Sequence, residues 1–534
     1  MSRIEGNGLQ HGIGHRALLR AERLRMEDGD RIGIVGRNGA GKTTLLRILA
    51  GELEPDAGHV TRRGTIGVIP QFKEDGAGSG GEMTSRVVEA VLVAEPDVLF
   101  ADEPTTHLDQ ERTERLEERL LGFRGALAVI SHDRFFLDRV CTQIWEIDAG
   151  EVRIYPGGYS DYERQKGLER RQHREKYEAY VEKRGALERA IRLKEQKAAG
   201  SMKPPSRLGS SEARMGKDYR RSTQAGIHQA KKALETRLTK LEKVDKPVEP
   251  PAVKLTVPVP PAAKNRVLLE VQDLEAAAGE RLLWSRVSFR LRFGEKAALL
   301  GPNGCGKTTL LRRILGGGGG VRLAPGVKPG YFSQTLEVLD LERSVLDNVR
   351  ETSLYDDGLA RLVLARLLLR GDEVYKRTGD LSGGERVKTA LAKLVLSDAN
   401  LLVLDEPTNY LDTLSLEALE SLLEGYPGTV LYVSHDRRFV ERTAGRILEL
   451  RDGRLFSFDG GYAAYREERG RGPAAPPAEN DAAGELLQVE LRLAEVLGRL
   501  SLPGAAEMEK LDAEFRELVK RRRELQGAVN NGSM

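Results

Sequence analysis

The feature that most constrains the fold is an internal repeat, because one module occurs twice along the 534-residue chain. The stretch "GRNGAGKTTLLRILAG" at Gly36 returns as "GPNGCGKTTLLRRILGG" at Gly301, and "LFADEPTTHLD" returns as "LVLDEPTNYLD". Further on, "VISHDRFFLDRV" returns as "YVSHDRRFVERT" in the same order. A repeat of this length predicts two structurally equivalent domains, with room in the chain for further elements.

The spacing within the two copies differs at one place. Gln71 and Gln334 are 263 residues apart, whereas Ser79 and Ser382, which begin the two "SGGE" stretches, are 303 residues apart. The first copy therefore lacks a segment of 40 residues between these two points. In the second copy the segment includes "GLARLVLARLLLRGDEVYKRTGDLSGG", whose apolar residues at helical spacing predict a small helical subdomain.

Each copy has the strand, loop, helix order of a phosphate-binding loop. An apolar run, "DRIGIVG" or "KAALLG", precedes the glycine-rich loop, and an amphipathic helix is predicted after it. Later apolar runs, "DVLFAD" with "ALAVIS" and "NLLVLD" with "TVLYVS", predict buried strands of a largely parallel sheet. The expected fold class is therefore α/β, with two tandem P-loop domains.

The pattern GxxxxGK[ST] is complete in both loops, and it binds phosphate through backbone N–H groups and the charge of its lysine. We expect Lys42 and Lys307 to contact the β- and γ-phosphates of a nucleotide. The hydroxyl after each lysine should hold Mg²⁺ together with an aspartate that ends a strand, which gives Thr43, Asp102, Thr308 and Asp405 as metal ligands. The predicted nucleotide-binding residues of the loops are Gly36, Asn38, Gly39, Gly41, Lys42, Thr43 and Thr44 in the first copy and Gly301, Asn303, Gly304, Gly306, Lys307, Thr308 and Thr309 in the second.

Two repeated side chains are candidates for catalysis beside the phosphates. Glu103 and Glu406 directly follow the aspartates, where a carboxylate can orient or deprotonate an attacking water. His132 and His435, in the "SHDR" stretches after the next strand, are predicted to hydrogen-bond the γ-phosphate. An isolated histidine is usually structural, but recurrence at the same offset in both copies favours the catalytic interpretation.

The region between the copies has a different composition. Residues 160–246 contain 24 Lys and Arg against 13 Asp and Glu, a net charge of +11 in a chain whose total is +3. Two segments repeat apolar residues at the spacing of helices that pack along a narrow seam. These residues are Tyr177, Val181, Leu187 and Ile191 in the first segment and Ile227, Leu234, Leu238 and Leu241 in the second. The pattern predicts a basic antiparallel helical hairpin over residues 159–246, with its tip at about 201–220.

Two further segments flank the second copy. The proline-rich residues 247–265 predict a fairly extended strap between the hairpin and that copy. Residues 471–534 begin with the low-complexity "GPAAPPAENDAAG" and continue with charged apolar-periodic stretches. They predict a flexible segment followed by a C-terminal helical extension.

The combination of "SGGE", "DEPT…LD" and "SHDR" resembles the ATP-binding-cassette superfamily in both halves of the chain. The resemblance implies a first cassette at residues 1–158 and a second at 266–470, which close head to tail within one monomer around ATP and Mg²⁺. The first site would then combine its own loop with Ser382, Gly383, Gly384 and Glu385, and the second would use Ser79, Gly80, Gly81 and Glu82. Gln71 and Gln334 would complete the two metal shells.

Two fused cassettes joined by a basic hairpin resemble the ABC-F family of ribosome-binding ATPases. The stretches "IPQFK…SGGEMT…LFADEPTTHLD" and "EVLGRLS", with the shortened first cassette, are similar to its Vga-type antibiotic-resistance proteins. This resemblance implies ATP hydrolysis in the E site of the bacterial ribosome, with the hairpin displacing P-site tRNA, 23S rRNA and bound drug. Lincosamides, streptogramin A compounds and pleuromutilins are the implied drugs. The implied effector residues at the tip are Lys203, Arg207, Arg214 and Lys217.

Composition narrows the class of protein. The chain has two cysteines, Cys141 and Cys305, and neither an export signal nor an apolar run near the ~20 residues that span a bilayer. We therefore expect a cytoplasmic protein with no membrane domain and no DNA partner. Two alternatives stay open at this point: an ATPase subunit that serves separate membrane subunits, and a housekeeping ABC-F factor that gates translation elongation.

Overall fold

The computed structural model describes residues 2–14, 16–71, 80–106, 108–200, 210–247, 267–279, 281–470 and 518–520. The chain separates into two units, Met1–Gly461 and Tyr462–Met534. The second unit contains the helix α13 (Tyr462–Gly470) and a short helical stretch at residues 518–520. Almost all of the predicted strap, and all of residues 471–534 except 518–520, lie outside the described residues.

Cassette 1 is built on a nine-stranded mixed sheet in the order β4-β1-β2-β9-β8-β3-β7-β6-β5. Its strands are β1 (Ser2–Ile13), β2 (Arg16–Glu27), β3 (Arg31–Gly36), β4 (Ala57–Arg62), β5 (Ile66–Ile69), β6 (Val98–Asp102), β7 (Ala126–Ile130), β8 (Gln143–Asp148) and β9 (Glu151–Pro156). Its helices are α1 (Lys42–Ala50), α2 (Gly80–Val93), α3 (Gln110–Gly122) and α4 (Arg134–Val140). The strands β5, β6, β7, β3 and β8 are parallel neighbours, as the continuous apolar runs predicted.

The parallel strands of cassette 1 are buried on both faces. Along β6, Val98 and Phe100 pack into one apolar cluster with α1, while Leu99 and Ala101 pack into another with α3 and α4. Successive strand residues point to opposite faces, so a strand covered on both sides must be apolar throughout. This sandwich holds the carboxyl ends of β3, β6 and β7 at one edge of the sheet.

Cassette 2 repeats the arrangement with its strands divided between two sheets, β11-β10-β13 and β14-β15-β16-β12-β17-β18. The strands are β10 (Val267–Ala278), β11 (Arg281–Arg292), β12 (Lys296–Leu300), β13 (Val321–Leu323), β14 (Pro329–Phe332), β15 (Leu401–Asp405), β16 (Thr429–Val433), β17 (Arg446–Arg451) and β18 (Arg454–Asp459). The helices are α7 (Lys307–Gly316), α8 (Val345–Thr352), α9 (Asp357–Arg366), α10 (Gly383–Leu396), α11 (Thr413–Glu424) and α12 (Arg437–Thr443), with 3₁₀ turns at Gly371–Tyr375 and Thr378–Asp380. The division between the two sheets is slight. In cassette 1, the Arg20 N–H donates to the Gly150 carbonyl oxygen at 2.6 Å and joins the two parts of the sheet. In cassette 2, the Ser285 N–H donates to the Gly453 carbonyl oxygen at 3.1 Å in the same place.

The 40-residue difference falls between a strand and the helix that begins at the "SGGE" stretch, which we call the signature helix. In cassette 2, residues 333–382 separate β14 from α10 and contain α8, α9 and the two 3₁₀ turns. In cassette 1, only residues 70–79 separate β5 from α2. Cassette 2 therefore carries a helical layer, held by contacts of α8 and α9 with α10, in an interval where cassette 1 has ten residues.

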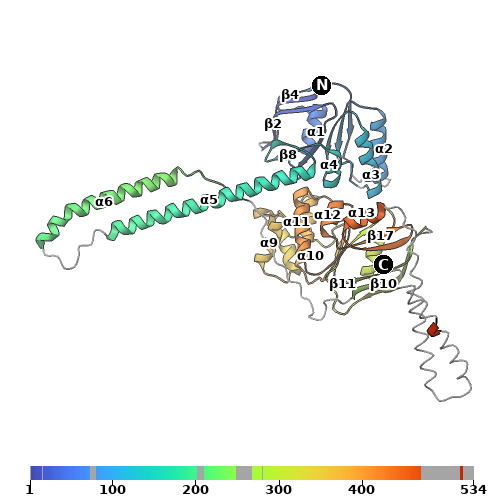
Figure 1. Cartoon of the computed structure of the whole chain (residues 1–534). Helices are drawn as coiled ribbons and strands as arrows, with labels where there is room; N and C mark the ends of the chain where they lie inside the picture. Colours follow the sequence, from blue (N-terminus) through green and yellow to red (C-terminus); the bar gives the residue numbers. More distant parts are fainter. Residues whose placement is uncertain are drawn as a thin grey trace, which may run out of the picture. The chain divides into compact units, whose positions relative to one another are not determined.

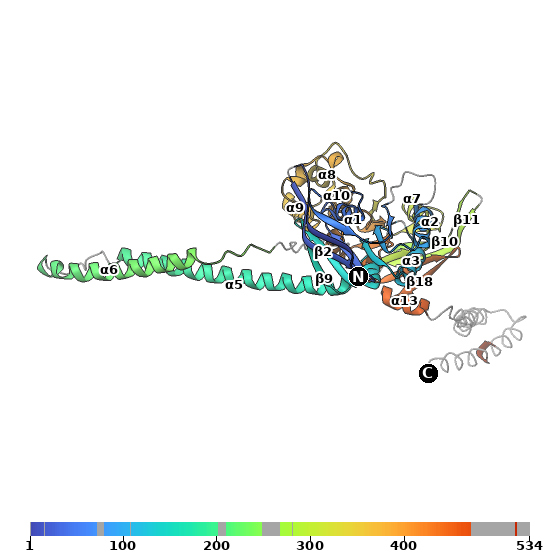
Figure 2. The ribbon, with the colours of Figure 1, turned by 90° about the horizontal axis from the view of Figure 1, so that it is seen from above.

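The hairpin consists of α5 (Tyr159–Gly200) and α6 (Ser210–Thr239), which run side by side in Figures 1 and 2. A Lys231 Nζ to Glu195 carboxylate ion pair of 2.7 Å joins them. The predicted tip at 201–220 was too long, because "SSEARMGKDYR" continues as helix from Ser210 and leaves 201–209 outside the described residues. The assignment of Val181 to the seam was also wrong: its side chain is 48% exposed, since the register set by Lys231 and Glu195 places it beyond the end of α6 at Thr239.

Candidate functional site

The two P-loops have nearly the same geometry. Each loop ends in a glycine with a left-handed backbone, Gly41 at φ 99° and Gly306 at φ 96°, a conformation that favours glycine over residues with a Cβ. The next residue begins the helix. Lys42 Nζ donates to the carbonyl oxygens of Gly36 and Arg37 at 2.9 and 3.2 Å. Lys307 repeats these contacts with its own loop at 2.8 and 3.1 Å, so each ammonium group is held at its own P-loop, beside a helix N-terminus that suits phosphate.

Oxygen ligands for a cation gather beside each P-loop. Thr308 Oγ1 lies 3.3 Å from Asp405 Oδ1, and the other carboxylate oxygen of Asp405 is buried without a hydrogen-bond partner. Burial raises the pKa of Asp405 and that of Asp102, while a hydrogen bond from Thr43 opposes the effect at Asp102. Buried hard oxygens of this kind fit Mg²⁺, which prefers such ligands.

The remaining predicted metal ligands lie at the same edge of each sheet. Gln71 and Gln334 are exposed and follow β5 and β14, whose parallel neighbours β6 and β15 end at Asp102 and Asp405. The carboxyl ends of parallel neighbours meet at one sheet edge, so these side chains can reach the same region.

The Glu–His pairs are also repeated. Glu103 Oε2 accepts from the His132 backbone N–H at 3.3 Å, and His132 Nε2 lies 3.4 Å from Glu103 Oε1. In cassette 2 the corresponding Glu406–His435 distances are 3.3 and 3.3 Å. Both glutamates have a left-handed backbone, at φ 50° and 53°, and both Oε1 atoms are buried without a hydrogen-bond partner. A carboxylate with an unused lone pair beside a histidine can accept a proton from, or orient, a water.

Burial sets the ionisation of these groups. It raises the pKa of Glu103 to about 8, partly opposed by the charge of Lys42, and lowers the pKa of His132 to about 3. Burial also lowers the pKa of His435. The histidines are therefore neutral near pH 7, with one ring nitrogen able to accept and the other to donate.

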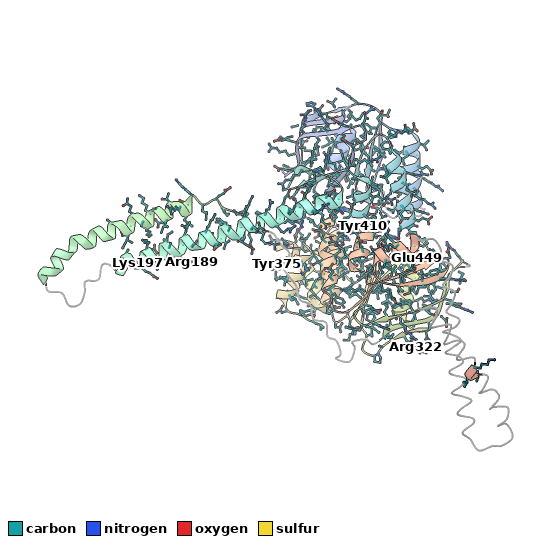
Figure 3. The ribbon with its side chains drawn as sticks, viewed as in Figure 1. Arg189, Lys197, Arg322, Tyr375, Tyr410 and Glu449 are labelled. Atoms are coloured by element: carbon teal, nitrogen blue, oxygen red, sulfur yellow. The ribbon has the colours of Figure 1, made fainter. Side chains whose placement is uncertain are left out.

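The loop of cassette 1 faces the signature of cassette 2. Asn38 N–H donates to Asp412 Oδ2 at 3.0 Å, and Asn38 Nδ2 donates to the carbonyl oxygen of Tyr410 at 3.1 Å (Tyr410 is labelled in Figure 3). Asn38 Nδ2 also lies 3.6 Å from the position of a Cβ on Gly384. Ser382 caps this signature helix by accepting from the Glu385 N–H at 3.4 Å, and Glu385 accepts from the Ser382 N–H at 2.9 Å. These contacts place the loop of cassette 1 beside the start of α10 and the Tyr410 loop of cassette 2.

The reciprocal contact involves Asn303, whose N–H donates to Asp109 Oδ2 of cassette 1 at 3.2 Å. Asp109 and Asp412 are the N-caps of α3 and α11, so each cap aspartate reaches the P-loop of the other cassette. Of the first signature, Ser79 lies outside the described residues, and Gly80, Gly81 and Glu82 form the first turn of α2.

Comparison with known proteins shows which family has this architecture. A family model described as ABC transporter matches residues 19–75 and 284–409. The ribosome protection protein VmlR of Bacillus subtilis is 32% identical, with 94% of each chain covered. ABC transporter F family member 5 of Arabidopsis thaliana is 31% identical over 82% of this chain and 74% of that protein. The chain belongs to the ABC-F family.

The fold of this ABC-F protein is also that of a solved structure, the RNase-L inhibitor, at a TM-score of 0.58 and 19% identity, with 87% of this chain and 93% of that chain covered. The fold class is thereby confirmed as tandem α/β cassettes, and the protein is an ATPase. Among the helices that the structure describes, none combines the length and apolar character needed to cross a bilayer.

The ABC-F protein has inter-cassette ion pairs that sequence analysis did not predict. Arg134, fully buried at 0% exposure, donates to Glu420 of cassette 2 and lies 3.6 Å from Asp436. The counterpart Arg437 donates to Glu117 of cassette 1 and, at 3.3 Å, to Asp133. The arginines and the glutamates are each 303 residues apart, so the repeat offset was a signal that could have flagged them.

The predicted effector residues are only partly described. Lys203 and Arg207 lie outside the described residues, and Arg214 and Lys217 belong to the backbone of α6. The described part of α5 nevertheless exposes basic side chains, among them Arg189 and Lys197 (Figure 3).

Proposed function

We propose that this ABC-F ATPase binds the bacterial ribosome and protects it from antibiotics that act at the peptidyl-transferase centre. The observation that carries the proposal is the basic hairpin, because residues 160–246 have a net charge of +11 and lie largely in two long helices, α5 and α6. Lys and Arg on such a rod bind phosphates without reading sequence, which suits rRNA and tRNA. The similarity to VmlR, which is named a ribosome protection protein, supports the same function.

Within the proposed cycle, the residues around each P-loop bind one ATP. Lys42 and the loop N–H groups of residues 36–44 would bind its phosphates in the first site, and the helix start at Ser382–Glu385 would face the γ-phosphate from cassette 2. Glu103 orients water, or deprotonates it when the carboxylate is ionised, and His132 holds the γ-phosphate geometry. Lys307, Glu406 and His435 would have these roles in the second site, together with Ser79–Glu82.

Thr43, Gln71 and Asp102, and their counterparts Thr308, Gln334 and Asp405, would hold Mg²⁺. The unpartnered buried oxygen of Asp405 supports this assignment. When bound, Mg²⁺ supplies positive charge that offsets the charge developing on the phosphoryl oxygens. The protein's own part is to position the carboxylates and to exclude bulk water by bringing the two cassettes together.

The finer proposal follows the Vga-type resemblance. The protein acts in the E site with its hairpin directed toward the peptidyl-transferase centre, where Lys203, Arg207, Arg214 and Lys217 contact RNA. There it shifts P-site tRNA and 23S rRNA so that a lincosamide, streptogramin A or pleuromutilin leaves. ATP hydrolysis then releases the cassettes and withdraws the hairpin.

Expression in a susceptible bacterium tests this function. The chain should raise the inhibitory concentration of at least one of the three drug classes, and the Glu103→Gln, Glu406→Gln form should co-sediment with ribosomes when ATP is present. Alanine at Lys203, Arg207, Arg214 and Lys217 should reduce protection, whereas Lys183→Ala with Arg192→Ala, on exposed positions of α5, is the matched control. Ribosome binding without any drug protection would instead indicate a housekeeping factor. Recovery with membranes and not with ribosomes would refute the proposal.

A further inference from the structure

The root of the hairpin is fixed to cassette 1 through a buried carboxylate. Glu146, on β8, accepts from Lys166 Nζ at 2.7 Å and from the Tyr162 hydroxyl at 2.8 Å. Tyr155 donates to the same carboxylate at 3.3 Å. A buried charge that is paired and fully hydrogen-bonded is costly to disrupt, so the first turns of α5 move as part of cassette 1.

The same turns of α5 are also bound to cassette 2. Glu163 accepts from Arg438 through one oxygen and from Arg442 through the other, the latter at 2.8 Å. The Arg438 guanidinium also lies 5.7 Å from the centroid of the Tyr159 ring. Farther along the helix, Arg170 lies 3.8 Å from Glu417 of α11. One short stretch of α5 therefore contacts both cassettes.

The internal repeat shows that Arg438 is specific to this contact. At the offset of 303 residues its counterpart is Phe135, so "SHDRFF" in cassette 1 becomes "SHDRRF" in cassette 2. Phe135 packs under the guanidinium of Arg437 at 4.6 Å. An arginine replaces the aromatic residue in cassette 2, and there it meets Glu163 of the hairpin root.

Arg442 connects this contact to the inter-cassette ion pair of Arg134. Besides Glu163 it donates to Glu420 at 3.0 Å, and Glu420 accepts from Arg134. Arg134 is two residues from His132 in the "SHDR" stretch. A continuous row of hydrogen bonds between charged side chains thus runs from Arg134, at the start of α4 in cassette 1, through Glu420 and Arg442 of cassette 2 to the hairpin root.

We propose that Glu163, Arg438 and Arg442 form a latch that fixes the direction of the hairpin only when the two cassettes are together. The members of the latch are positioning residues, since they act on the hairpin and touch no nucleotide. With the cassettes apart, Glu163 loses both arginines, and α5 keeps its contacts with cassette 1 at Glu146 and Asp138. The purpose of the latch, to aim the hairpin at RNA, rests on the proposed function, whereas the latch itself is testable without a ribosome.

Distances between spin labels test the latch in the full chain. The parent protein carries Glu103→Gln and Glu406→Gln to retain ATP, and Cys305→Ala, the residue that cassette 1 has at the equivalent position. One label pair, Leu193→Cys with Leu354→Cys, reports the hairpin against cassette 2, and both sites are 53% exposed. A second pair, Leu121→Cys with Leu354→Cys, reports the distance between the cassettes. With ATP and Mg²⁺, both label pairs in the parent protein should give narrow distributions of the distance between the two labels.

The variants separate the latch from cassette closure. Glu163→Gln and Arg438→Phe should each broaden the hairpin distribution by roughly twofold while the inter-cassette distance still responds to ATP. Arg438→Lys, which keeps the charge, should preserve most of the narrowing. An unchanged hairpin distribution in both Glu163→Gln and Arg438→Phe would refute the latch. Loss of the inter-cassette response would also refute it, because the residues would then be closure contacts.

A second readout connects the latch to the proposed function. In the chain with intact Glu103 and Glu406, Arg438→Phe should leave basal ATPase activity unchanged and weaken ATP-dependent ribosome retention on the order of 10-fold. Equal ribosome retention by Arg438→Phe and the unmodified chain would argue against the latch. If the unmodified chain binds no ribosomes, the proposed function fails, and the spin-label result still decides the latch.

Discussion

Cassette 1 and cassette 2 agree closely around their P-loops and Glu–His pairs and diverge where other elements attach. The His Nε2 to Glu Oε1 distance is 3.4 Å in one and 3.3 Å in the other, and the glutamate φ angles are 50° and 53°. Away from the sites, cassette 2 has a helical layer in residues 333–382 and Arg438 in place of Phe135. Both P-loops must bind phosphate, so the residues around them stay alike in the two copies. The hairpin contacts a different surface of each cassette, so the residues on those surfaces differ.

The cap aspartates extend this comparison to the interface. Asp412 reaches Asn38 at 3.0 Å and Asp109 reaches Asn303 at 3.2 Å, so the cross-contacts are as well matched as the sites. The residue before the "SGGE" stretch nevertheless differs between the two copies. It is Gly78 in the first copy and Leu381, which is buried, in the second. The two sites can therefore share chemistry and still differ in turnover.

The largest effect is expected from the glutamates. Glu103→Gln with Glu406→Gln should lower phosphate release from ATP by about 1,000-fold, because neither site retains a carboxylate beside the histidine. ATP binding, measured by equilibrium dialysis, should persist. The single variants show whether the two sites contribute equally, and Glu118→Gln on the exposed face of α3 is the control. Undiminished phosphate release in the double variant would contradict the assigned roles.

The next largest effect is expected at the buried arginines. Arg134→Met and Arg437→Met each remove a cross-cassette partner and leave a buried glutamate with one remaining arginine, Arg442 or Arg139. The ATP concentration at which half of the molecules have closed cassettes should rise on the order of 30-fold in either variant. The Leu121 and Leu354 label pair measures it. Arg115→Met, which replaces an exposed arginine, is the control and should have little effect. A response to only one of the two buried substitutions would show that the two ion pairs do not contribute equally to closure.

The signature glycines should give a smaller and more local effect. A Cβ on Gly384 would lie 2.6 Å from the Tyr410 carbonyl oxygen, whereas a Cβ on Gly383 would have no neighbour closer than 3.8 Å. In the Glu406→Gln background, Gly384→Ala should reduce ATPase activity by about 10-fold, because the Tyr410 loop must shift away from Asn38. Gly383→Ala is the matched control and should remain near the parent activity. Equal losses in both would show that the close contact is not the cause.

The smallest effect concerns the cysteines. Burial raises the pKa of both Cys305 and Cys141, so alkylation should be slow near pH 7 and accelerate as the pH rises toward the thiol pKa values. Half-exposed Cys305, in the second P-loop, should react before buried Cys141, and ATP with Mg²⁺ should slow it roughly threefold. Mass spectrometry of labelled peptides measures this, with Cys305→Ala as the blank. Faster labelling of Cys141 would contradict the burial of that residue.

Local sequence patterns were sufficient for the elements that position the sites. The apolar runs before Lys42 and Lys307, and those that end at Asp102 and Asp405, predicted β3, β12, β6 and β15, because strand burial depends on the residues of the strand itself. The hairpin was also predicted from its spacing. Its tip was predicted too long, since Gly and Ser near residue 210 do not prevent a helix from starting there.

The ion pairs required knowledge that local patterns do not contain. Arg134 meets Glu420 only because two cassettes dock with a particular offset, and periodicity within one segment cannot reveal a partner 286 residues away. The Glu163 contact with Arg438 is harder still, because the residue that corresponds to Glu163 at the offset of 303, in the short counterpart α13, is Arg466. Comparison of the copies position by position points to Arg438 as the place where the repeat changes from Phe to Arg.

The length of α5 gives its first turns a mechanical importance. At a rise of about 1.5 Å per residue, a helix of 42 residues extends about 63 Å from its root. A rotation of about 5° at Glu146 and Glu163 would swing the opposite end through about 5 Å, the height of one helical turn. A long stiff rod thus works as a lever arm, which magnifies a rearrangement of a few side chains into a movement comparable to the size of a nucleotide base.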